Sequence, residues 1–463
     1  MSDDLAYLGI VEAGKLFAAR KLSPVELTDA LLARCERLDP ALHAFIRLMP
    51  DEARTAARAT EAEFAAGRIA GPMQGIPFGL KDIIDLQGVA TTCHSKIFAD
   101  HVATSDADVT RRLKASGGVP FGKLATHEFA IGGPSFDLPW PPAVNPWGGA
   151  HFPGGSSSGS GVAVTSGMLP AALGTDTGGS VRNPASMCSI VGMKATYGRV
   201  SRAGVFPLAY SLDHIGPMTR TVADNTALLQ VLAGHDPGDP ASADVTVPDF
   251  SAEIGMDLKG LTIGHVRHFY DGDETAHPEM AAAVEKAAET LRELGADVRE
   301  IRLAPLQDYA TCNRTIIGAE AYAIHRRFLQ ERPGDYGELA RQRILNGVGI
   351  TAADYIDALR WRARLTAETQ AAMAGLDCIL TASSLDPAPR LDDAEGNART
   401  YPRQCRQPFN VPGQPALAVP AGVSSDGLPL GIHLAGHPGG EARIYRIAHA
   451  LEQATGYFKQ HPP

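Results

Sequence analysis

Serine and glycine gather in one stretch of the chain, from Gly154 to Arg182, whose residue types could carry nucleophilic chemistry. The stretch holds two clusters, GGSSSGSG at its start and GGS ending at Ser180. Serine hydroxyls are candidate nucleophiles or proton carriers when a base activates them. Glycine allows positive φ angles and close approach of the backbone to a ligand. A turn such as TGGS over residues 177–180 can aim several backbone N–H groups at one point, which is the geometry that holds an oxyanion.

A lysine stands out of an apolar run in the segment GIPFGLKD, residues 75–82. An apolar environment disfavours the charged form of Lys81 and lowers its pKa, which makes it a candidate general base near neutral pH. The alternative is a solvated lysine at the end of a strand. Likewise, the glycine-rich clusters, taken alone, could be flexible loops.

Other chemistries fit these residues less well. A phosphate-binding loop requires a Gly-Lys-Ser/Thr ending that the clusters lack, and no G-x-G-x-x-G opens a helix directly after a strand. Asp213 and His214 suggest a Ser-His-Asp arrangement, but adjacent residues do not easily form such a triad, and Lys81 matches better. The segment HEFA, residues 127–130, is not the HExxH of a zinc protease.

Taken together, several segments resemble the amidase signature family of serine hydrolases. The matching text is GIPFGLKD, NPWGGAHFPGGSSSGSG, LGTDTGGSVRNPASMCSIVGMKATYGRVS and SLDHIGPMTR, with weaker similarity near both ends of the chain. Residues 230–400 are the least alike. The resemblance implies the family's α/β fold, in which helices cover both faces of a central, twisted, mixed β-sheet.

The resemblance also implies roles for individual residues. Ser180 would be the nucleophile, Ser156 a bridging serine preceded by a cis peptide bond, and Lys81 the terminal base. The oxyanion hole would be formed by the backbone amides of Thr177, Gly178, Gly179 and Ser180. Supporting side chains would be Ser157, Asp176 and Arg182. The substrate pocket would be lined by backbone atoms of Ala130, Ile131, Gly132 and Gly133.

The activity implied is hydrolysis of a carboxamide C–N bond through an acyl-enzyme, with carbamates, anilides and esters also possible. One alternative is a glutaminase A-type subunit of a tRNA amidotransferase, although residues 305–330 lack the SNLARFDG-like stretch of such subunits. An inactive binding protein on the same fold is the alternative from another class, and the presence of all three triad residues argues against it.

Substrate specificity is expected to come from the variable segments 135–145, 305–350 and 400–414. In each case a place in the core is the alternative to a place in the pocket. The candidate pocket residues are Phe136, Trp140, Tyr309, Ile316, Ile317, Gln404, Cys405, Arg406 and Gln407.

The elements that must position these residues alternate between strands and helices, which predicts an α/β layer architecture. We expect one domain over residues 1–463, with a core at about 60–300 and 376–463 and a mostly helical flank at about 305–375. Expected strands lie at 75–82, 119–121, 261–266, 298–303, 377–380, 416–420 and 430–434. Expected helices lie at 51–68, 106–115, 221–233, 280–294 and 441–455, and one begins after the capping residue Ser23.

Composition and charge limit the partners and the cellular location that we expect. The 463 residues carry a formal net charge of −10, which argues against a nucleic-acid partner. The start, MSDDLAYLGI, is not a secretory signal, and no apolar run approaches the ~18 residues of a membrane helix. Six scattered cysteines fit neither a zinc site nor a disulfide scaffold and favour a cytoplasmic location. We therefore expect no metal or cofactor, a small-molecule amide or carbamate as partner, no nucleic acid, no membrane, and a monomer or homodimer.

Overall fold

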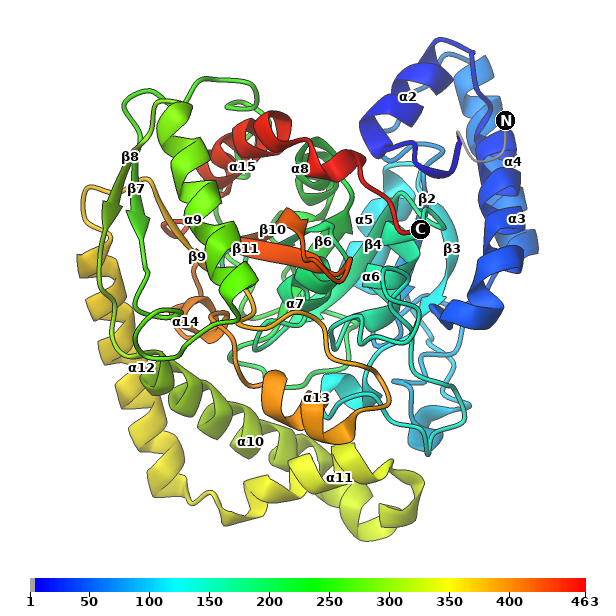
Figure 1. The fold of residues 1–463 in the computed structure, drawn as a ribbon. Helices are drawn as coiled ribbons and strands as arrows, with labels where there is room; N and C mark the ends of the chain where they lie inside the picture. The colour runs from blue at the N-terminus through cyan, green and yellow to red at the C-terminus, as the bar shows by residue number, and fades with distance from the viewer. Residues whose placement is uncertain (1–4) are drawn as a thin grey trace.

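The computed structural model describes residues 5–463, and one mixed sheet of 11 strands runs through it. The strand order is β1-β3-β2-β4-β6-β5-β10-β11-β9-β7-β8 (Figure 1). The strands are β1 (Phe45–Leu48), β2 (Pro77–Lys81), β3 (Val119–Leu124), β4 (Ala171–Asp176), β5 (Val191–Lys194), β6 (His214–Thr219), β7 (Thr262–His265), β8 (Asp297–Glu300), β9 (Cys378–Ala382), β10 (Ala416–Val423) and β11 (Pro429–Ala435).

Parallel and antiparallel pairs alternate in blocks across this sheet. The pairs β3–β2 and β2–β4 are parallel, as are β9–β7 and β7–β8 at the other end. The pairs between them, from β4–β6 to β11–β9, are antiparallel, and β1–β3 at the edge is antiparallel too. This arrangement confirms the expected α/β fold with a mixed sheet.

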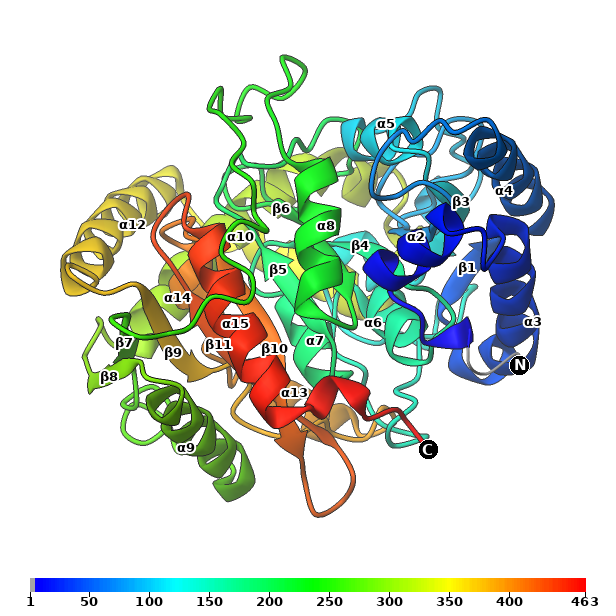
Figure 2. The same cartoon turned by 90° about the horizontal axis from the view of Figure 1, so that it is seen from above.

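Helices cover both faces of the sheet (Figures 1 and 2). On one face α6 and α7 pack together against the central strands, whereas α8, α9 and α15 pack against the other. The helices of these layers and of the N-terminal part are α2 (Ile10–Ala18), α3 (Pro24–Leu42), α4 (Pro50–Ala65), α5 (Asp108–Ala115), α6 (Ser158–Thr165), α7 (Arg182–Met187), α8 (Val222–Leu232), α9 (Pro278–Glu293) and α15 (Glu441–Thr455).

A helical flank lies along one edge of the molecule, at the bottom of Figure 1. The long helices α10 and α12 contact each other there, and α10 also contacts α11 and α14. The helices of this region are α10 (Leu306–Glu331), α11 (Glu338–Leu345), α12 (Ala352–Ala372), α13 (Ala394–Thr400) and α14 (Gln407–Asn410).

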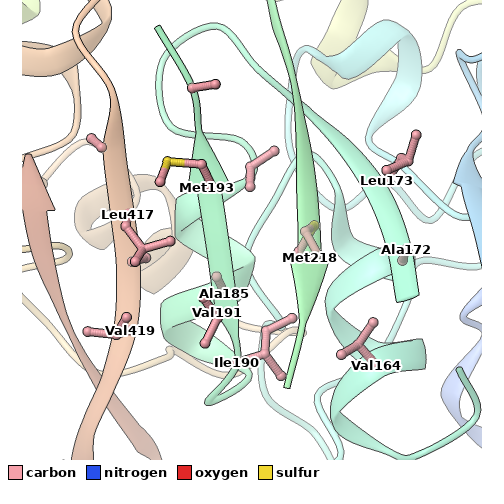
Figure 3. Close-up of a cluster of buried hydrophobic side chains, with 14 of the residues drawn as sticks. Val164, Ala172, Leu173, Ala185, Ile190, Val191, Met193, Met218, Leu417 and Val419 are labelled. Atoms are coloured by element: carbon pink, nitrogen blue, oxygen red, sulfur yellow. The ribbon is translucent and has the colours of Figure 1, made fainter. Parts of the chain in front are cut away.

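The core between the layers is apolar and closely packed. Figure 3 shows Leu173 of β4, Met193 of β5, Met218 of β6 and Leu417 of β10 within one buried cluster, with Val164 of α6 beneath them. Each such side chain contributes about 1.5–3 kcal/mol when it is fully buried. This packing fixes the sheet to the helices that carry the glycine- and serine-rich stretch. The continuity of the sheet from β1 at one edge to β8 at the other supports our proposal that the chain forms a single domain.

The sequence did not reveal the central strands. The apolar run from Val162 to Leu173 is divided between the end of α6 and the start of β4, and β5 and β6 were not predicted. All three strands are buried along their whole length, so they lack the alternation of polar and apolar residues that marks a half-exposed strand.

Candidate active site

Lys81 is the last residue of β2, and its side chain is fully buried. Because β2 and β4 are parallel, their carboxyl ends meet at one edge of the sheet. There Nζ of Lys81 lies 2.7 Å from Oγ of Ser156 and 2.8 Å from Oγ1 of Thr175. Burial lowers the pKa of Lys81 to about 7, although the negative charges of Asp176 and Asp213 oppose that shift. The amine can therefore lose its proton near neutral pH, as a general base must.

Ser156 approaches Lys81 from the loop that precedes α6. The peptide bond between Gly155 and Ser156 is cis, as the resemblance implied. The carbonyl oxygen of Ser156 accepts a hydrogen bond from the His127 N–H at 3.1 Å, and the Gly155 N–H donates to Oδ1 of Asn183 at 2.9 Å. A Cβ atom on Gly155 would lie 2.1 Å from the His127 ring, so this position requires glycine. These contacts hold the Ser156 hydroxyl against Lys81.

Ser180 lies in the turn between β4 and α7, which the carboxylate of Asp176 holds in place. Asp176 accepts hydrogen bonds from the Gly179 N–H at 2.9 Å and from Nε of Arg182 at 2.9 Å. The ion pair with Arg182 is fully buried, unlike a salt bridge on the surface. Burial alone would raise the pKa of Asp176, but Arg182 and Asn410 outweigh it and hold that pKa well below its usual range.

The backbone N–H groups of this turn differ in whether they donate a hydrogen bond within the described residues. The Gly179 N–H is taken by Asp176, so the expectation that it helps to form an oxyanion hole does not fit this arrangement. No acceptor within residues 5–463 takes a hydrogen bond from the N–H of Thr177, Gly178 or Ser180. Three of the four expected donors are therefore unengaged within the described residues, as donors to an oxyanion must be.

Ser157, the residue after Ser156, joins its loop to the turn that carries Ser180. The Ser157 N–H donates to the carbonyl oxygen of Ser180 at 3.2 Å, and the Ser157 hydroxyl donates to the carbonyl of Thr175 at 3.3 Å. Ser157 thus supports the turn through its contacts with the backbone carbonyls of Ser180 and Thr175. Within the described residues, no hydrogen bond joins the hydroxyls of Ser156 and Ser180. Such bonds are often loose before substrate binds.

Asp213 and His214 do not form a Ser-His-Asp arrangement. The carboxylate of Asp213 accepts a hydrogen bond from Oγ1 of Thr177 at 2.6 Å. The ring of His214 contacts Nζ of Lys194 at 3.3 Å, and neither His214 nor Asp213 bonds a serine hydroxyl in residues 5–463. The position of Asp213 beside Thr177 was not predicted from the sequence, since only the pairing of β6 with β4 brings it opposite the turn.

A cavity of about 390 Å³ opens at Ser180. Three of the four pocket residues expected from the HEFAIGG segment line it, namely Ala130, Ile131 and Gly132. Gly133 lies beyond it and lines a neighbouring cavity of about 530 Å³. The segment therefore forms part of the wall facing the candidate nucleophile.

Two arginines share this cavity with Ser180, and no aspartate or glutamate lines it. The guanidinium of Arg343 lies 5.4 Å from the ring centre of Tyr401, a cation–π contact. No side-chain hydrogen bond or ion pair joins the guanidinium of Arg343 or Arg314 to another part of residues 5–463. The cavity at Ser180 is therefore electropositive.

The variable segments contribute part of the same wall. Ile317, Gln404 and Gln407 line the Ser180 cavity, and Phe136 lines the neighbouring one, where its side chain is 67% exposed. Tyr309 and Ile316 are buried in the core. The candidates that line neither cavity are Trp140, Tyr309, Ile316, Cys405 and Arg406.

The described residues, 5–463, hold neither a cluster of metal-ligating side chains nor a membrane-spanning helix. No group of three or more His, Cys, Asp or Glu side chains there is arranged to hold a metal ion. No helix in that range is both long enough and apolar enough to cross a bilayer. The six cysteines are buried and unpaired.

Comparison with known proteins agrees with this geometry. The family model described as Amidase matches residues 26–445. The A-type subunit of the glutamyl-tRNA(Gln) amidotransferase of Geobacter metallireducens is 40% identical over 484 aligned residues, which cover 99% of each chain. The chain therefore belongs to the amidase family, whose members act on C–N bonds.

Two solved structures show the same fold. The peptide amidase of Stenotrophomonas maltophilia superposes with a TM-score of 0.88 at 30% identity, and 98% of each chain is covered. The second structure is an inhibitor-bound chain, which gives a TM-score of 0.91 at 30% identity. It comes from a complex described as vestigial and as revealing the evolutionary origins of an s-triazine catabolic enzyme. This match covers 97% of our chain and 99% of the other. The fold is that of the amidase signature enzymes.

The expected partners are wrong. We predicted a small-molecule partner, no nucleic acid, and a monomer or homodimer. The relatives at 38–40% identity are named as A-type subunits of glutamyl-tRNA(Gln) amidotransferases, and these names refer both to an enzyme with several subunits and to a tRNA. A net charge of −10 is a sum over the whole chain, so it describes neither a local face nor the other chains of an assembly.

Proposed function

We propose that the chain is the amide-hydrolysing subunit of an amidotransferase-type assembly, in which it releases ammonia from a carboxamide for another subunit to use. The observation that carries this proposal is the 40% identity to the A-type subunit of an amidotransferase over 99% of both chains. Free, buried thiols are consistent with the reducing, cytoplasmic compartment that belongs to this proposal.

The proposed reaction begins with Lys81 as a neutral amine. Nζ lies within hydrogen-bond distance of both Thr175 Oγ1 and Ser156 Oγ, so with an N–H directed at Thr175 its lone pair can take the Ser156 proton as Ser156 takes the proton of Ser180. The Ser180 oxygen then attacks the carbonyl carbon of the carboxamide and forms a tetrahedral oxyanion. The open N–H groups of Thr177, Gly178 and Ser180 would stabilise that charge, and removal of one such donor typically costs 10²–10³ in rate.

Collapse of the tetrahedral intermediate breaks the C–N bond. The proton held by Lys81 returns through Ser156 to the leaving nitrogen, so ammonia departs as a neutral molecule and an ester to Ser180 remains. A water molecule, deprotonated along the same route, attacks this ester and releases the carboxylic acid. The cycle ends with Lys81 neutral and Ser180 restored.

The charge of the cavity fits a carboxamide donor that also carries a carboxylate, as glutamine does. Arg343 and Arg314 have no anionic partner of their own within residues 5–463, and both line the cavity that opens at Ser180. Hydrogen bonds from a guanidinium to a carboxylate are charge-assisted and can be bidentate.

A second candidate is an amidase that works alone. The similarity to a peptide amidase over 98% of both chains favours it, as does the lack of an SNLARFDG-like stretch in residues 305–330. Ammonia release from glutamine and from simple amides, measured with the purified chain and with its co-expressed partner chains, separates the two. Glutamine hydrolysis that rises on addition of partners and tRNA supports the amidotransferase role. Full activity of the lone chain on simple amides, unchanged by partners, would refute it.

A further inference from the structure

Asp213 lies opposite the turn that carries Ser180, because of how two strands pair. Strands β4 and β6 are antiparallel, and their last matched residues are Asp176 and His214. At the next position beyond this pair, Thr177 lies opposite Asp213. Strand pairing therefore brings a carboxylate to the turn from a segment 36 residues away.

The Asp213 carboxylate joins this turn to a second loop. It accepts hydrogen bonds from Oγ1 of Thr177 at 2.6 Å and from the N–H groups of Leu208 at 2.9 Å and Ala209 at 3.1 Å. Leu208 borders both the Ser180 cavity and a second cavity of about 710 Å³, into which Asp213 also faces. One carboxylate thus fixes the turn and the wall between two cavities.

We propose that Asp213 is a positioning residue for the reaction described above: it holds Thr177 with its N–H directed at the oxyanion, and its negative charge acts on the Lys81 amine. The inference rests on the proposed function, since it assigns a role within the same site. It adds a residue that neither touches the substrate nor belongs to the Lys81, Ser156 and Ser180 relay.

Thr177 has a second restraint that leaves its amide free. The side-chain amide of Asn313 donates to the Thr177 carbonyl at 3.1 Å, while Asp213 holds the hydroxyl. With both of these groups fixed, the Thr177 N–H has no acceptor in residues 5–463. A donor held in place in this way needs little reorganisation when the oxyanion forms.

The charge of Asp213 is also less compensated than that of its neighbour. Asp176 forms a buried ion pair with Arg182, whereas Asp213 forms no ion pair among the described residues, and the charge of Arg202 lowers its pKa only in part. Burial raises the pKa of Asp213 to about 6, opposed by the hydrogen bond from Thr177, so the group is mainly ionised at pH 7.

Several groups act on Lys81. Burial lowers its pKa, while the charges of Asp176 and Asp213 oppose that shift. The Cys93 thiol is neutral near pH 7, since burial raises its pKa well above the usual value. The imidazole of His127 is also close, and its own pKa is lowered well below the usual range by burial and then by Lys81. Removal of the Asp213 charge alone should therefore make Lys81 easier to deprotonate.

The test compares D213N with T177V and T177S by measuring hydrolysis of a simple amide from pH 5 to 9. D213N removes the charge and places an NH₂ group against backbone N–H donors, so we expect kcat to fall about tenfold. We also expect the acidic limb of the kcat/KM profile to move to lower pH by about half a unit. T177V keeps the carboxylate of Asp213 and loses the hydroxyl, so kcat should fall while the limb moves less than in D213N. T177S should restore kcat.

The outcomes separate this inference from the proposed function. The role of Asp213 would be overturned if the acidic limb of the D213N profile lay at the same pH as in wild type. It would also be overturned if T177V had the wild-type kcat. If D213N does not fold, the comparison of T177V with T177S still decides whether the contact matters. A wild-type chain that neither hydrolyses amides nor reacts at Ser180 with a fluorophosphonate would instead overturn the proposed function.

Discussion

Nζ of Lys81 lies 2.7 Å from Oγ of Ser156, at a place where neither side chain reaches solvent. A protonated lysine so deeply buried is costly unless a counter-charge touches it, and the contacts of Nζ here are hydroxyls. The geometry therefore favours a neutral amine beside a serine, the arrangement that a proton relay needs.

Replacement of Lys81 by alanine should lower kcat by several orders of magnitude, because the relay loses its base. In the wild type the pKa of Lys81 is lowered to about 7 by burial, so kcat/KM should fall about tenfold per pH unit below pH 7 and level off above it. The variant should lose this acidic limb. The measurement is a pH–rate profile, with the exposed lysine variant K21A as the control, which should match wild type. An unchanged limb in K81A would show that another group titrates.

Replacement of Ser180 by alanine should abolish covalent labelling by a fluorophosphonate, because the hydroxyl that attacks phosphorus is absent. Intact-protein mass spectrometry gives the readout. S105A, at an exposed serine outside the turn, is the control and should still be labelled. Label found on S180A would place the nucleophile at another residue.

The chemistry was easier to predict from the sequence than the fold around it. Lys81 and the Gly-Gly-Ser turn stand out because a charge in an apolar run and dense glycine are unusual, whatever the fold. Strands β4, β5 and β6 were missed because they are buried on both faces and show no alternation.

Contacts that depend on strand pairing were also out of reach. The pairing of Asp213 with Thr177 follows from the register between β4 and β6. The engagement of the Gly179 N–H by Asp176 is a matter of turn geometry. Residue types and spacing along the chain determine neither.

Replacement of Asp176 by asparagine should destabilise the fold strongly, because Arg182 would remain buried without its counter-charge. Loss of one partner of a buried ion pair typically costs about 3–5 kcal/mol. Chemical denaturation measures the change in the free energy of unfolding. The matched control is D357N, whose pair with Arg360 is exposed and should be worth less than about 1 kcal/mol. Equal losses in D176N and D357N would contradict the account of a buried pair.

Replacement of Arg343 by glutamine should weaken binding of a donor that carries a carboxylate, because the cavity at Ser180 would lose a cation. A hydrogen bond to a charged group contributes about 1.5–3 kcal/mol, so KM for glutamine should rise about 10- to 150-fold with little change in kcat. Rates on an uncharged amide of similar length should stay near those of wild type. Steady-state ammonia release measures both.

Arg341 provides the matched control for this prediction, since it lies on the same helix but is paired with Glu338 and lines neither cavity. R341Q should therefore keep the wild-type KM for both substrates. A selective rise in KM for glutamine in R343Q alone assigns carboxylate recognition to this side chain. If R343Q loses activity on glutamine and on the uncharged amide equally, Arg343 supports the shape of the cavity, and the carboxylate is held elsewhere.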